Sequence, residues 1–437
     1  MKSTPKLFAF TIVAVLAMPL FARAQSVTPA TGNLNLAPID QTSMFARDRD
    51  VSVRERARPD YQAAGIPVGS LTFFPKIEGD IEYNDNIYAT STGEVSDEIF
   101  RIKPQAMLES NWSRHFVDLY GSATANEYAN HTTENTTDWD LGSDGRLDIV
   151  RGSDLRIGAE ASKLTVPRTS AGSPFDALRP VQYYYDAAYL IAEREVNRIK
   201  MSFKGDWDRY DYFNVPAIGG GTIIETDQNH DQFDADGRVD YALSPATAWF
   251  AELDGNWRPY HLPGILTPAR TSNGITALTG ANFEITNLIR GEIGVGYLRQ
   301  DYQSAAYKTV GGLALRGKLE WFPTELTTVT VTGTRSVQDA AVLGAGGYLT
   351  TDFGAQVDHE LLRNVILTAD ATYGHDTYNG VDRTDNRYTA GISATYLLNR
   401  RVGLNAGYVY FKQTSSGVDH GGTFAVNRLM AGVVLQY

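Results

Sequence analysis

Strict alternation of apolar and polar residues over long segments is the feature that most limits how this chain can fold. In the first such segment, 71–83, the odd positions are apolar or small: Leu71, Phe73, Pro75, Ile77, Gly79, Ile81 and Tyr83. The even positions from 76 onward are charged: Lys76, Glu78, Asp80 and Glu82. Because strand side chains alternate between two faces, the pattern predicts a strand with one apolar and one charged surface. Its length exceeds that of an ordinary globular strand and is sufficient to cross a membrane.

The same alternation recurs as far as the last residue. Clear examples are the segments 249–258, 311–321, 365–373 and 388–396. Counting such segments from Leu71 gives about eighteen strands, within a range of 16 to 18.

The connections between these segments alternate in length. The short ones are 111–114, 150–154, 243–247, 286–287, 322–325 and 399–400. The longer ones are rich in Gly, Ser, Thr, Asn and Asp and cover 85–97, 166–180, 214–228, 259–272, 337–347 and 413–422. Short periplasmic turns and long extracellular loops are typical of outer-membrane barrels. We therefore predict an all-β fold, a transmembrane antiparallel β-barrel in the bacterial outer membrane. With both termini periplasmic, its strand number is even.

The N-terminal 70 residues divide into two predicted pieces. Lys2 and Lys6 precede an apolar stretch over 7–21, and Ala22-Arg23-Ala24 is a cleavage signature, so we expect a signal peptide over 1–24. Residues 25–70 include the run 47–60, which carries charges of both signs without apolar periodicity. This composition favours a flexible periplasmic extension, with a docking arm for a periplasmic secretion partner as the alternative. The barrel is expected over 71–437.

Aromatic residues are spaced as expected for a membrane-spanning wall. Trp249 and Trp257 lie eight residues apart on one face, as do Tyr388 and Tyr396. At about 3.4 Å per residue and a tilt of about 40°, this spacing is roughly 21 Å of height, close to the apolar band of such barrels. These residues are expected at the two edges of the outer-membrane lipid. Aromatics that could stack on sugars are sought instead at inward or loop positions such as Tyr184, Tyr210, Tyr212 and Phe411.

Composition argues against several functions. The chain has no cysteine, which excludes a thiol nucleophile and Cys-ligated metals. A formal charge of -12 disfavours nucleic acid as a partner. The seven histidines are scattered, and no G-x-S-x-G or H-E-x-x-H motif occurs. The segment 227–236 offers oxygen ligands for Ca²⁺ but lacks the Gly and the closing Glu of a calcium loop. We expect no enzymatic activity, no cofactor and no metal.

Charged residues at alternating positions are the candidate lining of a channel. On the lipid side Lys or Arg would cost about 2 to 4 kcal/mol each at mid-bilayer, so these residues are expected to face water or one another. The candidates are Lys76, Glu78, Asp80, Glu82, Arg146, Asp234, Asp236, Arg238, Asp240, Glu252, Asp254, Arg316, Lys318 and Glu320. A barrel of 16 to 18 strands is wide enough for an aqueous channel.

The C-terminal end of the predicted barrel adds a further signal. The final strand has apolar residues at every second position and a terminal aromatic, Leu429, Ala431, Val433, Leu435 and Tyr437. This ending resembles the signal that the outer-membrane barrel assembly machinery recognises.

The opening of the barrel resembles a known family. The stretches concerned are Glu82-Tyr83-Asn84-Asp85-Asn86-Ile87-Tyr88-Ala89, Phe100-Arg101-Ile102-Lys103-Pro104 and Ser110-Asn111-Trp112-Ser113-Arg114-His115. They are similar to the first two strands of the putative beta-barrel porin 2 family. The resemblance implies an outer-membrane barrel of a Gram-negative bacterium connected with exopolysaccharide biosynthesis and secretion. It implies no catalytic residues.

Three functions follow as expectations. The first is a non-enzymatic channel for export or secretion of exopolysaccharide, with polysaccharide as cargo. The second is a general diffusion porin with a mild cation preference, because acids outnumber bases. The third is a structural outer-membrane anchor.

Overall fold

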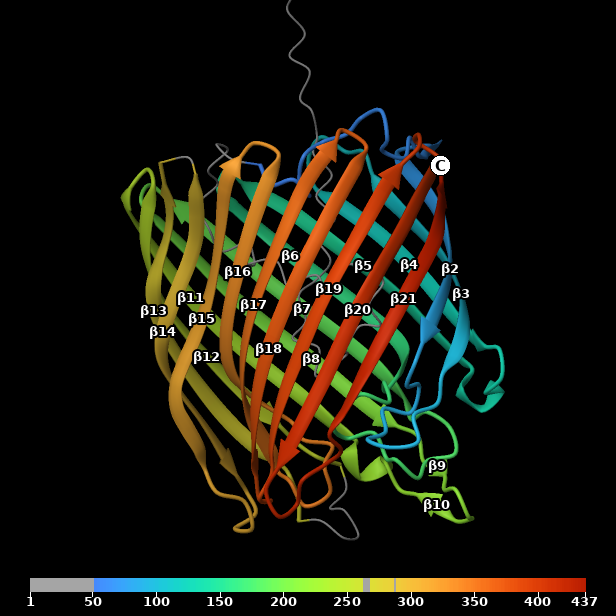
Figure 1. Ribbon diagram of the computed structural model, residues 1–437. Coiled ribbons are helices and arrows are strands. Elements are labelled where there is room, and N and C mark those ends of the chain that lie inside the picture. The colour runs from blue at the N-terminus through green and yellow to red at the C-terminus, as the bar shows by residue number, and fades with distance from the viewer. Residues whose placement is uncertain (1–50, 262–267, 287) are drawn as a thin grey trace, which may run out of the picture.

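The computed structural model describes residues 51–261, 268–286 and 288–437. The predicted signal peptide, residues 25–50 and part of the predicted loop 259–272 lie outside them. The described residues form a closed antiparallel barrel of 18 strands (Figure 1). This confirms the predicted fold class and strand number. The strands of the barrel are β2 (Leu71–Asn84), β3 (Asp97–Ser110), β4 (Phe116–Tyr128), β5 (Thr136–Val150), β6 (Ser153–Thr165), β7 (Gln182–Val196), β8 (Ile199–Tyr212), β11 (His230–Ser244), β12 (Thr247–Arg258), β13 (Ser272–Ile285), β14 (Ile289–Tyr302), β15 (Val310–Thr324), β16 (Thr327–Gln338), β17 (Gly347–Leu362), β18 (Val365–Asn379), β19 (Thr384–Leu397), β20 (Val402–Ser416) and β21 (Phe424–Gln436).

The barrel closes between its first and last strands. β2 pairs with β3 on one side and with β21 on the other. In the β2–β21 ladder, Lys76 lies opposite Gln436 and Asn84 lies opposite Arg428. A short strand, β1 (Ile66–Val68), pairs with the first residues of β2. β1 thus continues the ladder at the point where β21 ends, and the N–H of Gly65 donates to the carbonyl oxygen of Tyr437 at 3.1 Å. Closure leaves the wall without an unpaired edge, which a membrane requires.

Alternation along the strands gives the barrel its apolar outer surface. Ile77, Ile81 and Tyr83 of β2 are exposed on the outer face, as expected for side chains that would contact lipid. The predicted girdle residues also lie there, with Trp249 and Trp257 about half exposed. No helix in the described residues is long and apolar enough to span a membrane.

The two ends of the barrel differ in the length of their connections. Short turns lie at the end that holds the C-terminus, which is therefore the periplasmic end (Figure 1). The alternation of short and long connections matches the prediction, and two further tight turns, at 197–198 and 363–364, join β7 to β8 and β17 to β18. Asn197 has a φ of 55°, a left-handed conformation that Asn tolerates in so short a turn. The long loops contain the small elements η1 (Thr132–Glu134), β9 (Val215–Pro216), β10 (Thr222–Ile223) and η2 (Thr226–Gln228).

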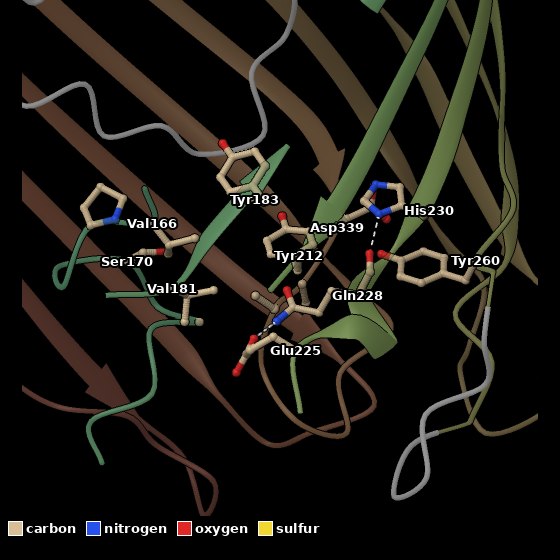
Figure 2. Close-up of a pocket in the computed structure, with 14 residues that line it drawn as sticks. Val166, Ser170, Val181, Tyr183, Tyr212, Glu225, Gln228, His230, Tyr260 and Asp339 are labelled. Carbon is tan, nitrogen blue, oxygen red and sulfur yellow. Dashed lines mark hydrogen bonds and ion pairs between the residues drawn. The ribbon is translucent and has the colours of Figure 1, made fainter. Parts of the chain in front are cut away.

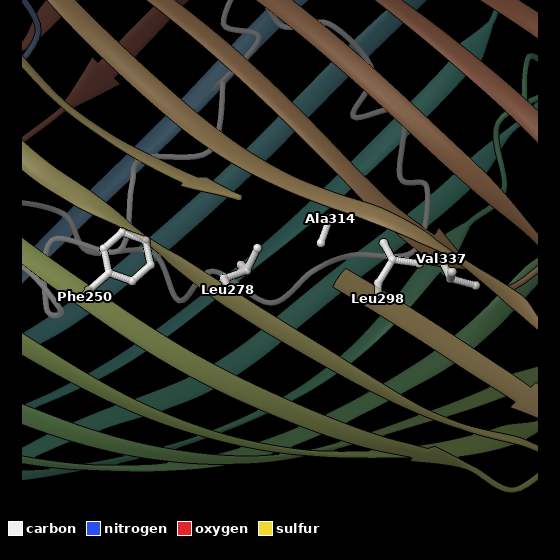
Figure 3. Packing of buried hydrophobic residues seen from close by; sticks show 5 residues of the cluster. All are labelled: Phe250, Leu278, Leu298, Ala314 and Val337. Atoms are coloured by element: carbon white, nitrogen blue, oxygen red, sulfur yellow. The ribbon is translucent and has the colours of Figure 1, made fainter. Parts of the chain in front are cut away.

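The inner wall is not uniformly polar. A diagonal strip of buried apolar residues crosses β12 to β16 on the inside (Figure 3). It begins near the periplasmic end at Phe250 and reaches the extracellular end at Val337, with Leu278, Leu298 and Ala314 between them. The alternation pattern places Phe250, Leu278, Leu298 and Ala314 inside, whereas Val337 has the opposite parity to the inward Thr328 and Thr330 of β16 and joins the strip only through the tertiary structure.

Candidate functional site

The inner face of the barrel holds the charged residues that the sequence singles out. Strand register places every second residue inside, so each candidate shares a face with its neighbours two positions away. All of the predicted lining residues lie on this inner face: Lys76, Glu78, Asp80, Glu82, Arg146, Asp234, Asp236, Arg238, Asp240, Glu252, Asp254, Arg316, Lys318 and Glu320. Whether they border the conduction path stays a prediction.

An arginine-centred cluster joins four strands of this wall. Arg238 on β11 donates to Asp240 at 2.8 Å and to Glu292 on β14 at 2.7 Å. Arg316 on β15 donates to Glu252 on β12 at 2.7 Å. The Arg238 guanidinium also lies over the Phe250 ring, 3.9 Å from its centroid. Because buried acids are stable when they are paired, the cluster makes this part of the wall polar with its charges largely balanced.

A second cluster lies on β17 to β19, toward the extracellular end. Arg387 on β19 donates to Asp376 on β18 at 2.7 Å and to Asp352 on β17 at 2.9 Å. Nearby, Arg383 donates to Asp385 at 2.7 Å. In both clusters, acids on the inner wall are therefore paired with arginines.

The periplasmic mouth holds the chain's own N-terminal segment, residues 51–65. The N–H of Val53 donates to Oγ1 of Thr328 on β16 at 3.0 Å, and Arg54 pairs with Asp358 on β17 at 2.9 Å. Glu55 accepts from Arg290 on β14 at 2.7 Å. All three wall residues lie at the periplasmic ends of their strands. The segment is thus seated on the inner wall at the mouth.

One contact of the N-terminal segment is an ion pair in which both side chains are buried. Arg58 donates to Glu360 on β17 at 2.8 Å and to the carbonyl oxygen of Val53 at 2.9 Å, and both charged side chains are under 10% exposed. Burial lowers the pKa of Arg58, and the Glu360 carboxylate opposes that shift. Arg56 adds a longer pair to Glu360 at 3.3 Å.

The rest of the N-terminal segment follows the rim toward the C-terminal strands. Arg400 donates to the carbonyl oxygen of Pro59 at 2.9 Å, and Gln436 donates to that of Tyr61 at 3.3 Å. Residues 51–65 therefore differ from the flexible extension that their composition predicts. The reason is that the mixed charges, which look solvated in sequence, find opposite charges on the wall.

At the extracellular mouth, two loops meet across the lumen. We call the β6–β7 loop (166–181) and the β16–β17 loop (339–346) the cap; they start from opposite sides of the barrel. Ala171 packs on the buried cluster of Ala340, Ala345, Tyr348 and Tyr378. The approach is so close that a Cβ at Gly172 would lie 2.1 Å from the Cβ of Ala341, so only glycine fits there.

Arginines anchor the cap to neighbouring loops. Arg168 donates to both oxygens of the buried Glu134, at 2.7 and 2.9 Å, and to the carbonyl oxygen of Ala177 at 3.0 Å. From the β12–β13 loop, Arg270 donates to the carbonyl oxygen of Ala340 at 2.9 Å. The cap is therefore held by charge-assisted bonds as well as by apolar packing.

A small cavity lies beneath the cap, on the lumen side of β7, β8 and β11 (Figure 2). We call it the cap cavity; its volume is about 60 Å³. Its aromatic and polar lining consists of Tyr183, Tyr212, Tyr260, His230, Glu225, Gln228, Asp339 and Ser170. Burial raises the pKa of the Glu225 carboxyl to about 7, and the charge of Asp227 contributes to the shift.

The aromatics sought as sugar-stacking residues separate into two groups. Tyr210 and Tyr212 lie inside, beside or in the cap cavity, and Phe411 is buried on the inner face of β20. Tyr184 instead lies on the outer face, 43% exposed and close to Trp139 and Phe213. The register explains this correction, because its neighbours Tyr183 and Tyr185 take the inward positions.

Sequence reasoning missed the parts of the site that depend on contacts between segments. The seating of the N-terminal segment and the meeting of the cap loops join residues far apart in the chain. The His230 ring stack joins neighbouring segments, because Tyr210 and Tyr260 lie directly beside His230 in the sheet. In the residues that the structure describes, no group of three His, Asp or Glu side chains is placed to hold a metal ion. The oxygen-rich segment 227–236 forms no such group either.

Comparison with family models shows to which protein family the chain belongs. The model of the putative beta-barrel porin 2 family matches residues 58–437. The chain belongs to this family. The match begins at the buried Arg58 and covers the whole barrel, so this family member is a porin-like barrel of the bacterial outer membrane.

Comparisons with individual proteins give more distant likenesses. No curated protein matches the sequence. Among solved structures, the chain is similar to a ferric enterobactin receptor (PfeA) mutant from Pseudomonas aeruginosa, with 8% identity, a TM-score of 0.45 and coverage of 86% of this chain and 81% of that one. It is also similar to the outer membrane protein OpdK from Pseudomonas aeruginosa, with 11% identity, a TM-score of 0.43 and coverage of 84% and 99%. A siderophore receptor, PirA from Acinetobacter baumannii, matches at 7% identity and a TM-score of 0.45, with coverage of 83% and 80%.

Proposed function

We propose that this porin-family barrel is a gated, non-enzymatic channel for neutral, hydroxyl-rich solutes, with secreted exopolysaccharide as its cargo. The observation that most supports the proposal is that the chain's own segments occupy both mouths of a polar lumen. The N-terminal segment is bonded to the wall at one end, and the cap covers the other. A conduit wide enough for a polymer would leak small solutes if it stood open, so closure at rest suits export.

The balance of charge on the wall supports a neutral cargo. Acids such as Asp240, Glu252 and Glu292 are paired with Arg238 or Arg316, which leaves oxygen and nitrogen atoms available to exchange bonds with sugar hydroxyls. The overall acidic excess, a formal charge of -12, works against an anionic polymer.

The proposal is tested by measuring the channel conductance of the purified protein and of deletion variants, and the polysaccharide secretion of a strain that lacks the protein. Purified protein in planar bilayers is expected to be mostly closed, and deletion of residues 168–177 from the cap is expected to raise its conductance. Deletion of residues 417–421 from the β20–β21 loop is the matched control and is expected to leave the conductance low. A strain lacking the protein is expected to lose surface polysaccharide. Normal secretion by that strain would refute the export proposal.

The acidic excess also favours a second candidate, a general diffusion porin with a mild cation preference. That function requires a lumen that is open at rest. High small-ion conductance of the unmodified protein, with cations preferred and secretion unchanged in the deletion strain, would support it over the export channel.

A further inference from the structure

The cap cavity holds a histidine whose free nitrogen has no partner. His230 is stacked between Tyr210 and Tyr260, with ring centroids 4.6 Å away on each side and ring planes within 12°. Its Nδ1 lies 2.7 Å from the carbonyl oxygen of Gln228, so in the neutral ring the proton sits on Nδ1. The other nitrogen, Nε2, is then an acceptor. It is buried and has no hydrogen-bond partner among the described residues.

The carboxylate of Asp339 close to this nitrogen is also an acceptor. Oδ2 of Asp339, in the cap, lies 3.7 Å from Nε2 of His230, and Oδ1 of the same carboxylate has no hydrogen-bond partner in the part of the chain that the structure describes. Two buried acceptors that face each other call for a molecule that donates hydrogen bonds to both, because unsatisfied buried polar atoms are costly. Hydroxyl groups can do this.

The charges around the cap cavity favour a neutral ligand. Arg258 already pairs with Asp339 at 3.3 Å, and Arg270 lies 3.7 Å from Asp227. The raised pKa of Glu225 leaves that carboxyl partly protonated near neutral pH. An anion would meet Asp339, and a cation would meet two arginines, so neither charge is favoured.

The size and lining of the cavity suit one sugar ring. A volume of about 60 Å³, at about 10 to 15 Å³ for each water position, corresponds to roughly four to six waters. At about 30 Å³ of liquid volume for each water, these occupy roughly 120 to 180 Å³, which is about the volume of one sugar unit of a polymer. Tyr183, Tyr212 and Tyr260 supply apolar ring surface beside the acceptors, as Figure 2 shows.

We propose that the cap cavity is a binding site for one neutral sugar unit, whose hydroxyls donate to Nε2 of His230 and to the carboxylate of Asp339. This site rests on the proposed function, because it names the cargo class that the channel would recognise. Since Asp339 belongs to the cap, a sugar bound there would contact the cap loop and the wall strand β11 together.

Titration calorimetry of the intact purified protein tests the site without any transport step. The probes are cellotetraose and maltotetraose, with choline as a cationic and tetragalacturonate as an anionic comparison. We expect at least one neutral oligosaccharide to bind in the millimolar range or tighter. The variant H230F keeps an aromatic ring in the stack and removes the acceptor, and D339N removes the carboxylate charge. Each is expected to weaken binding at least tenfold.

The control variant is H375F, which changes a histidine on β18 outside the cap cavity and is expected to bind as the unmodified protein does. Retention of heat-modifiable mobility on gels checks that each variant folds. The proposal is overturned if no neutral oligosaccharide binds, if H230F and D339N bind as tightly as the unmodified protein, or if only choline or only the anionic sugar binds. Sugar binding together with normal secretion by the deletion strain would retain this site and refute the export function.

Discussion

The buried ion pair between Arg58 and Glu360 gives the sharpest test of the periplasmic mouth. We consider the substitution E360Q, which keeps the shape of the side chain and removes its charge. Removing one partner of a buried pair costs about 3 to 5 kcal/mol. The amide oxygen still accepts one bond from Arg58, which restores about 1 kcal/mol. The net loss at the low end is therefore about 2 kcal/mol, or about 30-fold in the ratio of seated to released segment.

Cysteine labelling measures this ratio, because the chain has no native cysteine. Val53 is fully buried in the seated segment, and its wall contact uses the backbone N–H, so the substitution V53C keeps that bond. A maleimide reagent is expected to label V53C slowly. In the double variant V53C/E360Q the labelling rate is expected to rise about 30-fold.

The matched control is E82Q, which removes the charge of another buried, arginine-paired acid on a different part of the wall. The double variant V53C/E82Q is expected to label as slowly as V53C. Fast labelling of V53C by itself, or an unchanged rate in V53C/E360Q, would refute the inference that this ion pair holds the segment in the mouth.

Three further predictions concern the cap and the wall. Because burial raises the folded pKa of Glu225 from its ordinary 4.5 to about 7, its stabilising contribution is complete below about pH 4.5 and is lost as pH rises through about 7. The protection of residues 213–229 against hydrogen exchange, after correction for the intrinsic exchange rate at each pH, is therefore expected to be lower at pH 8.5 than at pH 5.5, and E225Q is expected to make the two protection values equal. The substitution G172V forces the two cap loops apart, since even a Cβ would lie 2.1 Å from Ala341, so single-channel recordings are expected to show more frequent opening; unchanged gating would mean that the loops do not close the mouth. The substitution L253R places a charge on the outer face and is expected to cost about 2 to 4 kcal/mol in denaturant unfolding from lipid vesicles. The substitution T276R places the same charge at a half-buried inward position opposite Asp254, at a similar height in the wall, and is expected to cost less; equal costs would contradict the assignment of faces.

The alternation of apolar and polar residues along each segment was sufficient to predict the barrel. The period of two along β2 and β12 assigns each side chain to a face, and lipid tolerates only one of the two faces outside. The alternation of short and long connections then orients the barrel in the membrane. The same pattern placed Arg238, Glu252 and Arg316 inside, although it could not say which of them pair.

Contacts across the lumen could not be predicted in this way. The mixed charges of residues 54–58 read as a solvated run, because the acids that pair with them lie some 300 residues later in the chain. Tyr184 was expected among inward or loop positions but lies on the outer face. Three consecutive tyrosines carry no period, so only the register of β7 decides that Tyr183 and Tyr185 point inward and Tyr184 outward.

The sequence by itself determined that this chain is an outer-membrane barrel with an apolar outside and a charged inside, because both properties follow from neighbours two residues apart. Only the tertiary structure decided where the N-terminal segment and the cap loops lie and where His230 meets Asp339. Those contacts join segments that are not neighbours in the sheet, and closure of the ring, which no local segment encodes, sets that arrangement.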